Sequence, residues 1–308
     1  MPLRRDTVST VLATRCSFIE GVGRNGVSAL KDQLGFLILI GAFGGLTGGL
    51  FGVGGSVVMI PALTETLGPD QHLYQAAAMI VNFFVAAPAA VQHYRMRAIQ
   101  GAVVVRLIPL SMVAVVVGVG ISELPIFAGR GEGYLRGLFG LFLGALSIQE
   151  LGRIWRSGAT LNTTGTLSDP NDPPAPPRTG PSPWRWAAAI AIPTGLIAGL
   201  LGVGGGLVAV PLQHRWLRVP MRTAIANSAA VIVATSFIGA AVKNYAFLQE
   251  HQGSMQAFAL SVVLIPSAVL GSLVGSRWVH VLSLRLIKAA FFVLLFIGAA
   301  RLVLGALG

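Results

Sequence analysis

The 308-residue sequence is strongly apolar: 54% of its residues are hydrophobic, 11% are charged, and the mean hydropathy is +0.75. This composition excludes an ordinary water-soluble domain and indicates an integral membrane protein. In a soluble protein the formal net charge of +11 would suggest a nucleic-acid partner. Here Lys and Arg fall in loops and at helix ends, beside anionic lipid headgroups, so we expect the bilayer as partner and no nucleic acid.

The chain begins with a basic N-terminal tail, residues 1–33. It has no continuous apolar stretch followed by a cleavage signal, so we expect a cytoplasmic or interfacial segment and no secretion signal. Cys16, the single cysteine, lies in this tail and cannot form an internal disulfide.

Long uncharged stretches then recur over residues 34–155, the first predicted membrane repeat. Several reach the roughly 20 residues with which a helix crosses a bilayer. We predict helices at 34–51, 56–68, 73–95, 100–122 and 134–153. Residues 156–183 follow as a linker, because their high proline content and few apolar residues do not favour a helix.

The last part of the chain, residues 184–308, repeats the pattern of the first. The segment "GLTGGLFGVGGSVVMIP" (45–61) returns as "GLIAGLLGVGGGLVAVP" (195–211), and Asn82 falls near the place of Asn227. We predict helices at 184–201, 206–217, 221–246, 254–281 and 284–306. The fold class is therefore an all-α polytopic membrane protein with two homologous halves of four to five membrane segments each.

The first hairpin of each half is expected to be broken at glycine. Whether the halves are inverted, with five crossings each, or parallel, with four, stays open, because the basic loop residues of the two halves indicate conflicting orientations. We place the protein in the cell membrane as a multi-pass protein.

The repeated glycines allow two interpretations. Small residues let helices approach closely in lipid. However, "GVGG" is followed by proline in both halves, at Pro61 and Pro211, which frees backbone polar groups that lipid cannot satisfy. Paired interruptions of this kind indicate a transporter binding site, and the amides that begin the next helix favour an anion.

Other chemistry finds little support in the sequence. "GVGGS" and "GVGGG" lack the third glycine of a dinucleotide fingerprint, and no Gly-Lys-Ser/Thr element occurs. The five histidines form no close pair, and all eleven acids lie in tails, loops or near segment ends. We therefore expect no cofactor, no metal and no enzymatic activity.

The motif "GLxxGLxGVGGxxVxxP" in both halves, with an asparagine in the next helix, resembles the TauE/SafE family of sulfite exporters and organosulfonate permeases. The resemblance covers nearly all of residues 34–307. It implies secondary transport of sulfite, organosulfonates or related sulfur-containing anions, without an ATPase or a prosthetic group. The residues that match the family pattern are Gly52, Gly54, Gly55, Asn82, Gly202, Gly204, Gly205 and Asn227.

We predict that these residues, with Ser56 and Gly206, bind a small oxyanion and that alternating access occurs around them. Interhelical hydrogen bonding is the simpler role for the two asparagines. His93, Arg106 and Lys243 are further candidates for the pathway or for coupling, against a role as interfacial anchors. If transport is coupled to protons, His93 or the substrate would carry them. A passive anion channel and a non-transporting scaffold remain as alternatives, and the oligomeric state is open.

Overall fold

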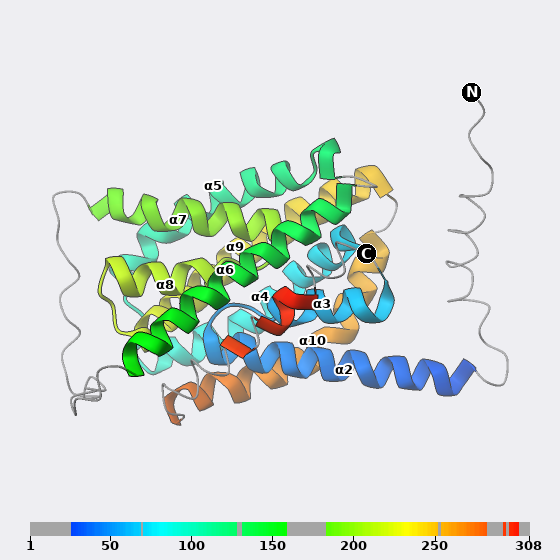
Figure 1. Ribbon diagram of the computed structural model, residues 1–308, viewed down its shortest axis with the longest axis horizontal. Coiled ribbons are helices and arrows are strands. Elements are labelled where there is room, and N and C mark those ends of the chain that lie inside the picture. Colours follow the sequence, from blue (N-terminus) through cyan, green and yellow to red (C-terminus); the bar gives the residue numbers. More distant parts are fainter. Residues whose placement is uncertain are drawn as a thin grey trace.

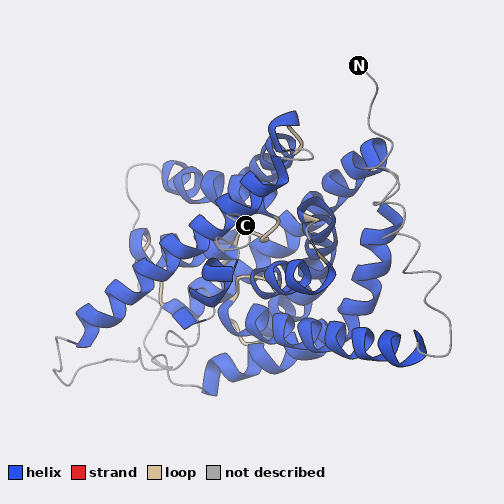
Figure 2. Cartoon of the chain, turned by 45° about the vertical axis from the view of Figure 1, so that its right-hand side comes forward, coloured by secondary structure: helices blue, strands red, loops and turns tan. Residues whose placement is uncertain are grey.

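A computed structural model describes residues 26–68, 70–127, 131–158, 183–251, 254–281, 292–293 and 296–301. Within these ranges every regular element is a helix and no strand occurs, so the predicted all-α class is confirmed (Figure 2). The helices are α2 (Gly26–Phe51), α3 (Ser56–Leu67), α4 (Gln71–Arg95), α5 (Gly101–Ser122), the short 3-10 helix η1 (Pro125–Phe127), α6 (Glu132–Gly158), α7 (Pro183–Leu201), α8 (Gly206–Trp216), α9 (Met221–His251) and α10 (Ser254–Val281).

Among the described residues, six helical segments are long and apolar enough to cross a membrane, which makes the chain a multi-pass membrane protein. They are Leu34–Phe51, Gln71–Arg95, Gly101–Ser122, Trp184–Leu201, Met221–Ala246 and Gln256–Trp278. Two shorter apolar helical segments, Ser56–Leu67 and Gly133–Ile148, accompany them.

The predicted helix boundaries agree with the structure to within a few residues at most ends. α2 differs, because it begins at Gly26, inside the predicted tail. Residues 1–25, most of the predicted linker (159–182) and most of the predicted last helix (284–306) lie outside the described residues.

The long helices pack in pairs that are distant in sequence. α2 lies along α10, α5 lies along α7, and α4 packs against α9 between these pairs. In Figure 1 the chain enters α2 at the right and runs to the left, whereas it enters α7 at the left and runs to the right. The first helices on the two sides of the linker therefore run in opposite directions.

Glycines allow these helix pairs to approach closely. A Cβ atom on Gly45 or Gly49 of α2 would collide with the backbone of α10, and one on Gly195 or Gly199 of α7 would collide with the backbone of α5. For these four positions the close-packing interpretation of the glycine motif holds.

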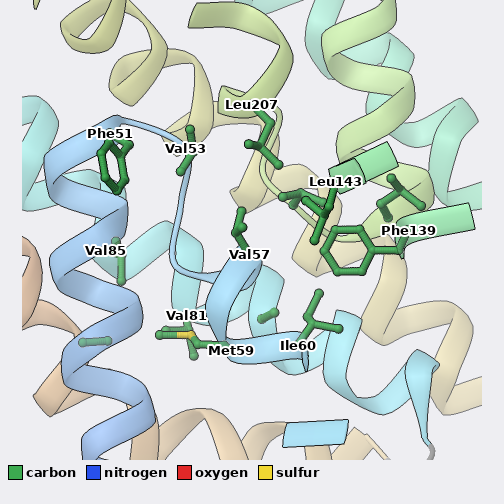
Figure 3. Packing of buried hydrophobic residues seen from close by; sticks show 14 of the residues in the cluster. Phe51, Val53, Val57, Met59, Ile60, Val81, Val85, Phe139, Leu143 and Leu207 are labelled. Carbon is green, nitrogen blue, oxygen red and sulfur yellow. The ribbon is translucent and has the colours of Figure 1, made fainter. Parts of the chain in front are cut away.

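The first two turns of the short helix α3 lie inside the protein, whereas its last residues, 65–67, are exposed. Met59, Ile60 and Leu63 are fully buried, and they belong to one apolar cluster with Phe139 and Leu143 of α6 (Figure 3). The start of α3 is therefore surrounded by protein side chains, and the non-helical residues that precede it are buried as well.

Candidate functional site

The first half of the site is a break between α2 and α3. α2 ends at Phe51 and α3 begins at Ser56. Between them Gly52 and Gly54 have φ angles of 64° and 84°, in the left-handed region that favours glycine. The helical path is interrupted here, within "GVGG".

A second break separates α7 from α8. α7 ends at Leu201 and α8 begins at Gly206. Gly202, Gly204 and Gly205 have φ angles of 73°, 73° and 87°. Both interruptions occur at the glycines that the motif indicates.

The two breaks meet inside the bundle. A Cβ atom on Gly206 would lie 2.5 Å from the Cα of Val53, so the start of α8 contacts the first break directly. Ser228 of α9 donates a hydrogen bond to the carbonyl of Gly52 (2.9 Å), and Asn82 of α4 donates one to the carbonyl of Gly202 (3.4 Å). The central helices α4 and α9 thus hold the breaks together.

Asn82 closes the start of α3. Its Oδ1 accepts hydrogen bonds from the amides of Gly55 (2.8 Å) and Ser56 (3.2 Å), and its Nδ2 donates to Ser56 Oγ (3.0 Å). The side chain is fully buried. The amides that the sequence suggests for anion binding at α3 are therefore already bonded to a protein oxygen.

The start of α8 differs. Its N-terminal position is Gly205, and among the described residues no side chain accepts a hydrogen bond from the amides of Gly205 and Gly206. Thr235 of α9 donates to the carbonyl of Gly204 (3.0 Å), so this carbonyl already has a partner. These amides lie at the positive end of an 11-residue helix.

A buried hydroxyl points into the same place. Ser236 is 1% exposed, and its Oγ has no hydrogen-bond partner among the described residues. A Cβ atom built on Gly204 would lie 3.2 Å from this Oγ and 3.3 Å from Asn82 Nδ2. Ser236 Oγ and Asn82 Nδ2 therefore both lie beside Gly204, but Asn82 Nδ2 already donates to Ser56 Oγ and to the carbonyl of Gly202. Ser236 is a candidate site residue that the sequence interpretation did not name.

Asn227 lies elsewhere. Its Oδ1 accepts from the amide of Gln100 (2.8 Å), and its Nδ2 donates to Gln213 Oε1 (3.0 Å), near the C-terminal end of α8. The structure therefore brings Asn82, but not Asn227, into hydrogen-bond contact with the glycine breaks.

The remaining pathway candidates are separated from one another in the fold. His93 is buried near the end of α4, and Arg106 is half-buried on α5. Lys243 of α9 is fully buried, which contrasts with the exposed position that an interfacial anchor would have.

Lys243 belongs to a polar cluster that the sequence did not reveal. Its Nζ donates to Glu123 Oε1, to Ser122 Oγ (2.9 Å) and to His72 Nδ1 (3.1 Å). His72 Nε2 lies 3.0 Å from the carbonyl of Phe127, which requires a proton on Nε2 and leaves Nδ1 as the acceptor in the neutral ring.

Glu123 follows the last residue of α5 and lies outside its membrane-spanning segment. Burial raises the pKa of this carboxyl, but the hydrogen bond from Lys243 and the positive charge of Lys243 outweigh burial, and the pKa is lowered to about 2. A signal for the pair does exist in the sequence: Glu123 and Lys243 each stand at the end of a long uncharged stretch.

The described residues contain no group of three or more His, Cys, Asp and Glu side chains that could hold a metal ion. The carbonyls of Gly52, Gly202 and Gly204 at the breaks already accept hydrogen bonds from Ser228, Asn82 and Thr235, which leaves amides and the Ser236 hydroxyl, groups that can donate to an anion.

In the part of the chain that the structure describes, six helical segments can cross a membrane, and two of them, in α2 and α7, lead into the glycine breaks. They define a polytopic membrane protein whose two breaks are buried in protein. The TauE/SafE sulfite exporter family model matches residues 37–302. The chain belongs to this family, as the resemblance of its motifs indicated.

Relatives of the chain are named as transporters. It is 28% identical to the "Probable membrane transporter protein MamO" of Magnetospirillum gryphiswaldense, over 94% of this chain and 48% of that protein. It is 22% identical to the "Probable membrane transporter protein YunE" of Bacillus subtilis, over 78% of this chain and 86% of that protein. The chain spans about half the length of MamO. No solved structure matches the chain significantly.

Proposed function

We propose that the protein is a secondary transporter that moves sulfite, organosulfonates or related sulfur-containing oxyanions by alternating access. The family and the names of the relatives support transport. The observation that carries the choice of an oxyanion is the set of unpartnered donors at the start of α8.

The oxyanion would bind beside Gly204. The amides of Gly205 and Gly206 begin α8 at its positive end, and the unpartnered Ser236 Oγ lies beside Gly204. Asn82 Nδ2 lies at the same place and would reach the anion by giving up its long bond (3.4 Å) to the carbonyl of Gly202. A tetrahedral or pyramidal oxyanion has several acceptor atoms for such donors, whereas chloride has no directional acceptors. In this site Asn227 has no direct contact with the anion; it supports the far end of α8 through Gln213.

Repeated contacts support two halves related by inversion. A Cβ on Gly52 would lie 2.8 Å from the side chain of Ile225, and one on Gly202 would lie 2.9 Å from that of Gln75. Both members of the first contact are shifted by 150 residues from those of the second (202 − 52 and 225 − 75). The opposite directions of α2 and α7 in Figure 1 favour inverted over parallel halves.

The exchange of partners between the halves favours alternating access. α2 packs on α10, and α7 packs on α5, so the first helix of each half lies against the other half. Rocking of these two packed units around the central pair α4 and α9 would expose the breaks to one side of the membrane at a time.

The test is a liposome assay with purified protein. Labelled sulfite and methanesulfonate are expected to show saturable counterflow, and chloride should neither be transported nor compete. Ser236→Ala should lower the apparent sulfite affinity about tenfold, the loss expected when one hydrogen bond to a charged group is removed. Ser261→Ala is the matched control, because Ser261 is equally buried but bonds to carbonyls of α4 and α10.

The alternatives give different results in the same assay. A channel would conduct without saturation or counterflow. A scaffold would show no flux of any anion. Sulfite transport that Ser236→Ala leaves unchanged would retain the transporter but exclude the site proposed at α8.

A further inference from the structure

The buried cluster of His72, Ser122, Glu123 and Lys243 joins three elements at one end of the central helices. Lys243 comes from α9, His72 from the first turn of α4, and Ser122 and Glu123 from the end of α5. The three acceptors around Lys243 match the three protons of its ammonium group. The exposure of the charged partners is unequal: the side chain of Lys243 is 0% exposed and that of Glu123 is 15% exposed.

We propose that Lys243 is a second oxyanion contact of the transport route and that Glu123 is the internal carboxylate that occupies it at rest, so that a passing oxyanion exchanges with Glu123. This inference rests on the proposed transport function. It adds a positively charged contact to a transport route whose proposed site beside Gly204 contains only neutral donors.

The packed interface between α4 and α9, here called the seam, runs from this cluster to the glycine breaks. Along α4, Asn82, Met79, Gln75 and His72 lie on one face, because they are spaced by three or four residues. The helix advances by ten residue steps from His72 to Asn82, about 15 Å at a rise of about 1.5 Å per residue.

The facing surface of α9 follows the same order. Ser236 lies beside Asn82 at Gly204, and Lys243 contacts His72. Between them Gly239 faces Met79, whose Sδ would lie 3.0 Å from a Cβ on that glycine. Gln75 contributes a buried Oε1 without a partner among the described residues. The seam is thus filled at rest, mainly by the flexible side chain of Met79.

The structure favours exchange over a purely structural ion pair for two reasons. Glu123 caps α5 and is followed by the exposed turn that leads to η1, so its carboxylate can move toward water without disturbing a helix. Lys243 lies within the membrane-spanning part of α9 and cannot follow it. A buried ammonium that loses its carboxylate needs another anion, and an oxyanion supplies the same acceptor atoms.

Two variants test this proposal by sulfite binding and by flux. Glu123→Gln removes the internal competitor, so the apparent Kd for sulfite is expected to fall at least about tenfold. Lys243→Met combined with Glu123→Leu removes both charges. Because replacing a buried ion pair by apolar residues is often neutral for folding, this double variant should fold yet lose most sulfite counterflow.

Glu65→Gln is the matched control, because it removes a carboxylate from the exposed ion pair with Arg301 and should change neither quantity. Folding of every variant is checked by its thermal midpoint and by gel filtration. Counterflow near the wild-type rate in the double variant would overturn the proposal, as would an unchanged Kd in folded Glu123→Gln. Absence of sulfite flux in the wild type would instead refute the transport function itself.

Discussion

Asn82 offers the sharpest test, because one side chain serves both the fold and the anion site. Asn82→Ala removes the acceptor for the amides of Gly55 and Ser56 and the donor to the carbonyl of Gly202. Asn82→Asp keeps an acceptor for both amides, but it removes the Nδ2 donor and adds a negative charge beside Gly204. The two variants should therefore fail for different reasons.

The expected magnitudes follow from these bonds. Each buried amide left without an acceptor costs about 1–3 kcal/mol, so the two amides together predict a loss of about 2–4 kcal/mol in Asn82→Ala once some relaxation is allowed. Interhelical bonds in membranes average only about 0.6 kcal/mol, which makes the bond to Gly202 a minor contributor. In Asn82→Asp the carboxylate can still accept from Gly55 and Ser56, so most of this stability should remain.

Thermal unfolding and sulfite counterflow are measured on the same preparations. We expect Asn82→Ala to have a clearly lower midpoint. We expect Asn82→Asp to have a nearly normal midpoint and almost no flux, because its charge repels the oxyanion. Asn227→Asp is the matched control and should retain flux, since its bonds go to Gln100 and Gln213. Normal sulfite affinity in Asn82→Asp would refute the placement of the anion beside Gly204.

Three further predictions concern other parts of the chain. Gly204→Ala should lower sulfite flux about tenfold or more, because the left-handed φ of 73° strains alanine and the added Cβ would lie against the proposed donors. Gly120→Ala is the control in the same flux assay and should have no effect, since no atom lies within 4 Å of a Cβ on Gly120. The pKa of Glu123 is lowered from 4.5 to about 2, so the ionised carboxylate should contribute fully to stability above pH 4.5 and progressively less as the pH falls from 4.5 toward 2. Thermal midpoints measured between about pH 6 and pH 3 should show this pH dependence in the wild type. The same pH dependence in Glu123→Gln would contradict the assignment. Deletion of residues 161–181 should leave counterflow within a few fold, because the helices on the two sides of the linker pack directly against one another, α2 with α10 and α5 with α7. Loss of flux in well-folded deletion protein would count against this.

The helices could be predicted well from sequence because their limits depend on local chemistry. Uncharged length sets the long helices, and glycine sets the breaks after Phe51 and Leu201, whereas Pro61 and Pro211 lie inside α3 and α8. No knowledge of helix neighbours is needed for these boundaries.

The donors at the centre could not be predicted in the same way, because they depend on which helix faces meet. The sequence pattern makes Asn227 the counterpart of Asn82 in the other half, which is an offset of 145 residues. In the structure, the contacts of α4 and α9 with the glycine breaks repeat at an offset of 150 residues. An error of five residues rotates a side chain by about 140° around a helix, onto another face. At the offset of 150 the counterpart of Asn82 is Ile232, which contacts Gly204.

Asn82 and Ile232 occupy equivalent positions in the two halves, but only Asn82 has a side-chain carbonyl, so the two breaks differ chemically. The carbonyl of Asn82 occupies the amides at the start of α3, while Ile232 has no oxygen to offer the start of α8. Two helix N-termini that face the same centre would repel one another if neither had an acceptor. A neutral carbonyl at α3 removes that repulsion and leaves only α8 in need of an anion. We infer that the centre binds one oxyanion at a time. Ile232→Asn would supply the missing carbonyl to the start of α8 and should therefore abolish sulfite binding in a folded protein. Calorimetry that showed unchanged sulfite binding to this variant would contradict the inference.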